Sequence, residues 1–182
     1  MKTRAEEQEF RRKIMSVLPR LSRFSFMLAR SRAEADDLLQ TACERALSRI
    51  DQWNPATRLD SWMFRIIQTV WFNELRSRKV RNGYAEKEQH AQDTADDGEQ
   101  AAEARVLLRR VEQEIRRLPE EQRIVLLLVC VEGMTYREAA DSVEIPIGTV
   151  MSRLARARLS LMERLGDAPV GQYDNVRKLS VR

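Results

Sequence analysis

Residues 133–158 read GMTYREAADSVEIPIGTVMSRLARAR, and this stretch decides the fold of the C-terminal half. Thr135, followed three residues later by Glu138, predicts a capping box at the start of a short helix. The Ile-Pro step at 145–146 predicts a turn, because proline interrupts helical hydrogen bonding, and a longer helix is expected from Ile147. Two helices joined by a short turn predict a helix-turn-helix unit, whose second helix normally enters the DNA major groove.

The periodicity of the second helix supports this interpretation. At about 100° per residue, apolar side chains form one stripe, and hydroxyl and guanidinium groups fall on the opposite face. The stripe consists of Val150, Leu154, Ala157, Leu161 and Leu165, and the opposite face consists of Thr149, Ser152, Arg153 and Arg156. An arginine that binds a guanine edge bidentately contributes about 1–3 kcal/mol of discrimination between bases. The alternative is an ordinary bundle helix with a solvated face.

The composition favours an all-α protein. The 182 residues are 43% hydrophobic and 33% charged, with 6 Gly and 5 Pro, which favours amphipathic helices over sheet. No apolar run approaches the roughly 18 residues of a membrane span, and the charged N-terminus lacks the apolar region of a secretory signal. A cytoplasmic location without membrane insertion is expected. One histidine, His90, and two cysteines, Cys43 and Cys130, leave no plausible zinc site. Both cysteines are expected in the core, with redox sensing as the alternative.

Charge divides the chain into three parts. Residues 1–81 carry 17 basic and 10 acidic side chains, residues 82–104 carry 1 and 7, and residues 105–182 carry 14 and 11. Two basic blocks with an acidic connector suggest two modules that meet one polyanion, although ordinary surface variation could produce the same pattern. The connector has too few large apolar side chains to order itself. We therefore expect two small helical domains, 1–81 and 105–165, joined by a flexible acidic linker and followed by a tail at 166–182.

Three helical segments are expected in the first block. The first spans about 5–30, with a break or kink at Pro19, which would suit the first turn of a second helical piece. Ser31 and Glu34 predict a capped start for the second helix, and the third is expected from about 60 to 79. The expected inward positions are Leu38, Leu39, Ala42, Ala46, Leu47 and Ile50 on the second helix, and Trp62, Ile66, Val70 and Leu75 on the third.

In the second block, one helix is expected to end at Leu118 and another to run from Pro119 to about Val131. Gly133 is expected to end the latter, because glycine readily adopts the left-handed conformation found after helix C-termini.

Separate stretches of the chain resemble the sigma-70 family, in its extracytoplasmic-function (ECF) group. Region 4 is resembled by three segments: LPEEQR at 118–123, GMTYREAA at 133–140 and PIGTV at 146–150. Region 2.2 is resembled by ADDLLQTA at 35–42, and regions 2.3 to 2.4 by LDSWMFRI at 59–66. The similarity covers roughly residues 10–81 and 105–165, in the family's order and spacing. Two linked matches are far more specific than a helix-turn-helix alone.

The resemblance implies an RNA polymerase sigma factor with a three-helix or four-helix region 2 bundle and a region 4 helix-turn-helix domain. Binding to the β′ clamp helices of core RNA polymerase is implied for Asp36, Asp37, Gln40 and Glu44. Recognition of the promoter −10 element is implied for Asn54, Arg58, Arg65, Thr69, Asn73 and Arg76. Recognition of the −35 element is implied for Thr149, Ser152, Arg153 and Arg156, with Tyr136 and Arg137 placed to hold phosphate. The implied partners are core RNA polymerase, including its β flap, promoter DNA and an anti-sigma factor.

The loop at 53–59 and the helix behind it resemble the part of region 2 that captures a base flipped out of the duplex. Base flipping requires protein contacts that offset a few kcal/mol of unstacking. Trp53, Trp62 and Trp71 are near this loop, but Trp62 in particular is expected to belong to the core. Many family members have asparagine where this chain has Thr69, and a basic residue where it has Met151. These departures affect which promoter sequence is expected to be recognised and not the general role.

Two other functions remain open from the sequence: a stand-alone helix-turn-helix regulator, and a sigma-like module that sequesters an anti-sigma factor without binding DNA. An enzyme is the least favoured class. The chain has no Gly-rich phosphate loop, no possible histidine-based triad and no convergent carboxylate cluster, so no cofactor and no small-molecule substrate are expected.

Overall fold

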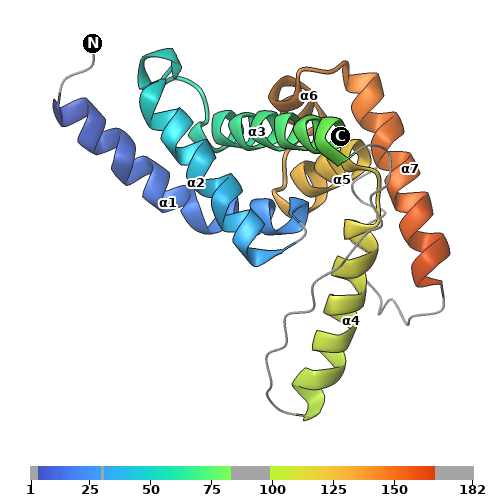
Figure 1. The fold of residues 1–182 in the computed structure, drawn as a ribbon. Coiled ribbons are helices and arrows are strands. Elements are labelled where there is room, and N and C mark those ends of the chain that lie inside the picture. The colour runs from blue at the N-terminus through green and yellow to red at the C-terminus, as the bar shows by residue number, and fades with distance from the viewer. Residues whose placement is uncertain (1–3, 30, 83–98, 167–182) are drawn as a thin grey trace.

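The computed structural model describes residues 4–29, 31–82 and 99–166, which contain helices and no strands. In chain order the elements are α1 (Arg4–Leu28), α2 (Arg32–Ser48), the 3₁₀ turn η1 (Ile50–Gln52), α3 (Leu59–Asn82), α4 (Glu99–Arg116), α5 (Glu120–Leu126), the π-helical turn η2 (Leu127–Val131), α6 (Tyr136–Val143) and α7 (Ile147–Leu165). Figure 1 shows α1 to α3 as one group and α4 to α7 as another. The predicted all-α fold of two small helical domains is confirmed.

The expected linker and tail are largely outside the described residues. Residues 83–98, which include His90, and residues 167–182 belong to this part of the chain. α4 begins at Glu99, so the helical part of the second block starts earlier than the expected boundary at residue 105.

Aromatic side chains form the centre of the first domain. The rings of Phe24 on α1 and Phe64 on α3 meet edge to face with centroids 4.8 Å apart. Phe10 contacts the ring of Trp53 at 5.3 Å. Such tilted pairs are favoured by the ring quadrupoles in addition to the burial of apolar area. They fasten α1 to α3 and to the loop before it.

The two expectations for α1 and α2 have different outcomes. The hydroxyl of Ser31 accepts a hydrogen bond from the backbone N–H of Glu34 at 3.2 Å, which confirms the predicted cap of α2. Of the predicted break or kink at Pro19, the break is wrong, because α1 is one helix with Pro19 inside it. Buried side chains on both sides of the proline, Ile14 and Leu21, anchor both halves of α1 in one core. This packing outweighs the backbone hydrogen bond that a proline removes.

The buried face of α3 differs from the predicted one. The predicted inward residues Trp62, Ile66 and Leu75 are only partly buried, and Val70 alone of the four is fully buried. The apolar side chains that α3 buries are Leu59, Met63, Phe64, Ile67, Val70 and Trp71. Because α3 contacts α1, α2 and α6, it needs apolar residues on most sides, and the sequence period alone does not select the most buried face.

The end of α5 is wound more loosely than an α-helix. The N–H of Glu132 donates to the carbonyl of Leu127 at 2.9 Å, a bond spanning five residues, and Gly133 follows with φ +68°. The left-handed glycine at this helix end confirms its predicted role. Cys130 in this turn is exposed, so its predicted place in the core is wrong. Cys43 is partly buried, and burial raises the pKa of its thiol.

The helix-turn-helix is present as predicted. The hydroxyl of Thr135 accepts from the N–H of Glu138 at 3.2 Å, and the Glu138 carboxylate accepts from the N–H of Thr135 at 2.8 Å, which completes the capping box. Ala139 is fully buried and lets α7 approach α6 closely. On α7 the stripe is buried at Val150, Leu154 and Ala157 and partly buried at Leu161 and Leu165.

The two domains contact each other directly. α6 packs on α3, and α1 contacts α4 and α5 (Figure 1). The Arg116 guanidinium of α4 is 4.3 Å from the ring centroid of Phe26 on α1, a cation–π contact. In this closed arrangement, the start of α3 faces the helix-turn-helix.

Candidate nucleic-acid interface

The outer face of α7 presents hydroxyl and guanidinium groups. Ser152 and Arg156 are exposed, and Thr149 is half-buried. The Nε of Arg156 donates to the backbone carbonyl of Ser152 at 3.3 Å, and the spacing of four residues places both on one face. Arg153 is half-buried and forms an ion pair with Glu121 of α5. The structure therefore brings the four predicted α7 residues to one side, with Arg153 held by a carboxylate.

The two predicted phosphate-holding residues are at the first turn of α6. Arg137 is exposed there. Tyr136 is half-buried and packs against the core, and its side chain interacts with Arg158 of α7. Arg137 can reach an approaching phosphate, whereas Tyr136 also connects the two helices.

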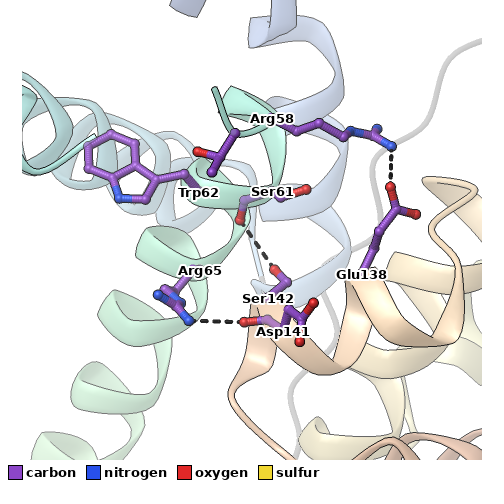
Figure 2. Close-up of a pocket in the computed structure, with 8 residues that line it drawn as sticks. Arg58, Ser61, Trp62, Arg65, Glu138, Asp141 and Ser142 are labelled. Carbon is purple, nitrogen blue, oxygen red and sulfur yellow. Dashed lines mark hydrogen bonds and ion pairs between the residues drawn. The ribbon is translucent and has the colours of Figure 1, made fainter. Parts of the chain in front are cut away.

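A cleft of about 330 Å³ separates the start of α3 from α6. One wall comes from the first domain and carries Thr57, Arg58, Ser61, Trp62 and Arg65. The other wall comes from α6 and carries Glu138, Asp141 and Ser142. Figure 2 shows side chains from both walls in contact across the cleft. Two arginines predicted to meet promoter DNA thus face α6 in this structure.

Arg58 connects both walls of the cleft. It binds the carboxylate of Asp60 through two nitrogens at 3.1 and 2.8 Å, and its Nη1 is 2.9 Å from Oε1 of Glu138. Burial tends to raise the pKa of Asp60, but the hydrogen bonds from Arg58 and from the backbone of Ser61 hold that pKa below its ordinary value. The pKa of Glu138 is lowered by the N–H and hydroxyl of Thr135, with a smaller contribution from Arg58. Both carboxylates are therefore held in the charged form.

Arg65 makes a second set of contacts across the cleft. Its Nη2 is 2.9 Å from the carbonyl oxygen of Asp141 (Figure 2). The same nitrogen is 2.8 Å from the Glu144 carboxylate. Ser142, which is buried, donates to the carbonyl of Ser61 at 3.2 Å. Glu144 caps α6 in the left-handed conformation with φ +53°, a position usually taken by glycine or asparagine.

Arg20 of α1 also connects the two domains, and no sequence pattern indicates this role. Its Nη1 is 2.7 Å from Asp60, and its Nε is 2.8 Å from Glu132, which follows η2. Both carboxylate side chains are less than 10% exposed, so their negative charges depend on these pairs. The two partners, Asp60 and Glu132, are 40 and 112 positions away from Arg20 along the chain. No local sequence pattern predicts such pairs.

The other residues predicted to meet the −10 element are not covered by α6 contacts. Thr69, Asn73 and Arg76 are exposed along α3, and the Thr69 hydroxyl donates to the carbonyl of Arg65 at 2.8 Å. Asn54 is exposed in the loop, where its side-chain oxygen accepts from the N–H of Ala56 at 3.0 Å.

The acidic face of α2 points away from the core. The four side chains predicted to bind core polymerase are all exposed: Asp36, Asp37, Gln40 and Glu44. Gln40 donates to Glu44 at 3.0 Å, one helical turn away. Among the described residues, no group of three or more His, Cys, Asp or Glu side chains could hold a metal ion.

Comparison with known proteins assigns the family. The model of sigma-70 region 2 matches residues 14–81, and the model of sigma-70 region 4 matches residues 108–161. The chain is 31% identical over 174 residues to the ECF RNA polymerase sigma factor EcfG of Rhodopseudomonas palustris, an alignment that covers 90% of this chain and 91% of EcfG. The chain belongs to the ECF group of the sigma-70 family. The resemblance inferred from the motifs is confirmed.

Other relatives of this ECF sigma factor agree. It is 28% identical over 144 residues to SigW of Bacillus subtilis, which covers 74% of this chain and 76% of SigW. A structure of the sigma factor RpoE in complex with the anti-sigma factor NepR from Bartonella quintana matches with a TM-score of 0.77 and 26% identity, over 88% of this chain and 99% of that one. CnrH in complex with the cytosolic domain of CnrY shares the fold, with a TM-score of 0.64 at 22% identity. No helix in the described part of this sigma factor is long and apolar enough to cross a membrane.

The tryptophans of region 2 differ in their access to DNA. Trp53 and Trp71 are buried, at 7% and 1% exposure, so neither can stack on a base without unfolding its surroundings. Trp62 is only half-buried: one edge packs on Phe10 at 6.1 Å between centroids, and another part lines the cleft. The prediction that Trp62 belongs to the core therefore holds only in part, and of the three it is the tryptophan that a base could reach.

Proposed function

We propose that this ECF sigma factor places core RNA polymerase at promoters through two DNA-binding surfaces, one on each domain. The observation that supports this most directly is that the two family matches fall on separate helical bodies, each with a face rich in arginine and hydroxyl groups. In this proposal α7 recognises the −35 element, and α3 with the loop before it recognises the −10 element.

The −35 surface consists of the outer face of α7. Exposed Ser152 and Arg156 suit hydrogen bonding to base edges. Arg153 joins them when its guanidinium leaves the carboxylate of Glu121 and binds DNA instead. Arg137, at the N-terminal end of α6, contributes a phosphate contact that fixes the position of the helix on the duplex.

The −10 surface begins at Asn54 and continues along α3. Arg58 and Arg65 supply positive charge at its start, and Thr69, Asn73 and Arg76 supply polar groups farther along the helix. Trp62 adds a partly exposed ring beside the two arginines, and aromatic rings of this kind bind unstacked bases.

We infer two protein partners. The exposed acidic face of α2 meets the β′ clamp helices of core polymerase, and region 4 meets the β flap. An anti-sigma factor is the second expected partner, supported by the similarity to RpoE, whose structure contains the anti-sigma factor NepR. Large apolar side chains exposed at Leu108 on α4 and at Leu159 and Met162 on α7 are suitable contacts for a partner of this kind.

Charge reversal at Asp37 is expected to weaken core binding about tenfold or more, because an exposed carboxylate at a charged docking face becomes a repulsive lysine. The measurement is the affinity of the Asp37→Lys variant for core polymerase by fluorescence anisotropy. Asp51→Lys, an exposed reversal in η1 outside the α2 face, is the matched control. An unchanged affinity of the Asp37 variant would count against this docking face.

In vitro transcription tests the proposal as a whole. The full chain is mixed with core polymerase and a pool of genomic fragments, and the 5′ ends of the transcripts are mapped. We expect start sites that share a pair of upstream elements and that require this protein. Binding to core without any new start site would instead favour a sigma-like module that sequesters an anti-sigma factor. Transcription without either shared element would refute the two-surface arrangement.

A further inference from the structure

The first turns of α7 carry exposed apolar side chains beside the polar residues proposed to read DNA. Met151 is 51% exposed, and Ile147, one turn earlier, is 46% exposed. Both lie in the N-terminal half of α7, and the N-terminal end of a recognition helix normally enters the major groove. Neither belongs to the buried stripe of the helix, and the polar contacts proposed for the −35 surface leave both without a role.

Small side chains separate Met151 from Arg156 around the helix. At about 100° per residue, three exposed residues lie between these two long side chains: Gly148, Ser152 and Ala155. Nothing in the described part of the chain lies within 4 Å of the position that a Cβ would take at Gly148. The backbone of α7 can therefore approach the floor of a groove closely, and a long side chain on each side of this narrow ridge can reach a base edge.

The chemistry of Met151 restricts what it can read. Its thioether has no donor and is only a weak hydrogen-bond acceptor, so it cannot bind a guanine edge or a phosphate as an arginine does. The apolar group that the major groove presents is the C5 methyl of thymine, which helps to distinguish an A·T pair from the other pairs. An unbranched, polarizable side chain such as methionine adapts its shape to a methyl group of this kind.

We propose that Met151 reads the C5 methyl group of a thymine in the −35 element. The inference rests on the proposed function, because it requires that α7 recognises this element. Ile147, one turn earlier on the same side of the helix, extends the apolar contact. The chain therefore requires an A·T pair at a position where a basic side chain would bind guanine or phosphate instead.

The spacing along α7 predicts where this base pair lies. Met151 and Arg156 are five residues apart, which corresponds to about 7.5 Å along the helix axis. Successive base pairs are separated by about 3.4 Å. We expect the thymine about two base pairs from the guanine that Arg156 reads.

The other exposed apolar residues of α7 form a separate group. Leu159 and Met162 lie in its C-terminal half, and Leu159 is about 12 Å beyond Met151 along the helix axis. Single exposed apolar side chains are common on protein surfaces and need no partner. Met151 differs from such residues because the hydroxyl of Ser152 and the guanidinium of Arg156 share its end of the helix.

Replacing thymine by uracil tests the contact, because it removes the C5 methyl group and leaves the hydrogen-bonding edge unchanged. Each thymine in the −35 element of a mapped promoter, on either strand, is replaced in turn by uracil. Run-off transcription by the holoenzyme at limiting concentration measures initiation. We expect a loss of about threefold to tenfold at one or two positions and no change at the others.

Variants of Met151 connect this loss to its side chain. Met151→Ala should initiate about threefold to tenfold less at the natural promoter, and uracil at the sensitive position should cause no further loss, because the contact is already absent. Met151→Lys should prefer guanine at that position. The matched control is Met15→Ala, the same truncation of a methionine on α1 that is 64% exposed. It should initiate normally and keep the sensitivity to uracil.

Three results would overturn the proposal. The first is equal sensitivity to uracil in Met151→Ala and in the unmodified factor. The second is a set of mapped −35 elements that share no A·T pair. The third is a loss of affinity for core polymerase in Met151→Ala, measured by fluorescence anisotropy, because the side chain would then serve a protein contact.

This proposal and the assignment of α7 to the −35 element can fail separately. If α7 does not read the element, Arg156→Ala initiates normally at the mapped promoters. If α7 reads the element but Met151 does not contact a methyl group, Arg156→Ala loses initiation, while Met151→Ala responds to uracil as the unmodified factor does.

Discussion

The double variant Arg153→Ala/Arg156→Ala should lose initiation at its mapped promoters by about 100-fold or more while binding core polymerase normally. Each base-reading arginine contributes about 1–3 kcal/mol, and each 1.4 kcal/mol corresponds to a factor of ten in binding. Both side chains lie on the outer face of α7, away from its buried stripe at Val150 and Leu154, so the domain should remain folded.

Run-off transcription from the mapped promoters measures this loss, and anisotropy with labelled core polymerase measures docking. The control is the double variant Arg110→Ala/Arg117→Ala, which replaces two other exposed arginines of the same domain. Because Arg153 also pairs with Glu121, the single Arg156→Ala variant separates DNA contact from any loosening of α5 and α7. Full transcription by the double variant would refute the assignment of α7 to the −35 element.

The largest expected loss of stability comes from Trp71→Ala, about 3–5 kcal/mol in the free energy of unfolding of the first domain. Trp71 is 1% exposed and is among the largest fully buried side chains, so truncation leaves a cavity between helices that cannot easily collapse. Urea unfolding followed by circular dichroism at 222 nm gives the change. Its indole N–H has no hydrogen-bond partner among the described residues, so Trp71→Phe should cost much less than the alanine variant.

Trp62→Ala is the functional counterpart. Trp62 is half-buried, so its removal should cost only about 1–2 kcal/mol of stability. If its ring supports an unstacked base, promoter opening should fall more than stability does, and permanganate footprinting of the −10 region measures that opening. Equal opening by Trp62→Ala and the unmodified factor would leave Trp62 with a structural role only.

The features that the sequence predicted correctly are local. The capping box of Thr135 and Glu138, the cap at Ser31 and the left-handed Gly133 each depend on residues within a few positions of one another. The buried stripe of α7 was predictable for a related reason: Val150, Leu154 and Ala157 repeat with the helical period. Family membership followed from motifs in both domains and from their order.

The features that the sequence did not predict depend on distant partners. The buried face of α3 was misjudged because α3 meets three other helices, and the approach of α6 is not encoded in its own period. The sequence does not indicate the ion pairs of Arg20, Arg58 and Arg65 across the two domains, because their carboxylate partners come from the other end of the chain. The sequence predicts a helix break at Pro19 because proline disfavours a helix interior. The tertiary packing on both sides of Pro19 that keeps α1 continuous is not visible in the local sequence.

The wide turn at Leu127–Val131 sets a limit on how this chain can vary. Its hydrogen bonds span five residues instead of four, so it accommodates one more residue than an α-helix of the same length. Deleting a single residue there would let the helix rewind regularly over the same length, whereas inserting a second residue would rotate all that follows by about 100°. Glu132 would then no longer point at Arg20, and the helix-turn-helix would meet the first domain with a different side. Insertions in this turn should therefore be far more disruptive than a one-residue deletion or than substitutions at exposed Cys130.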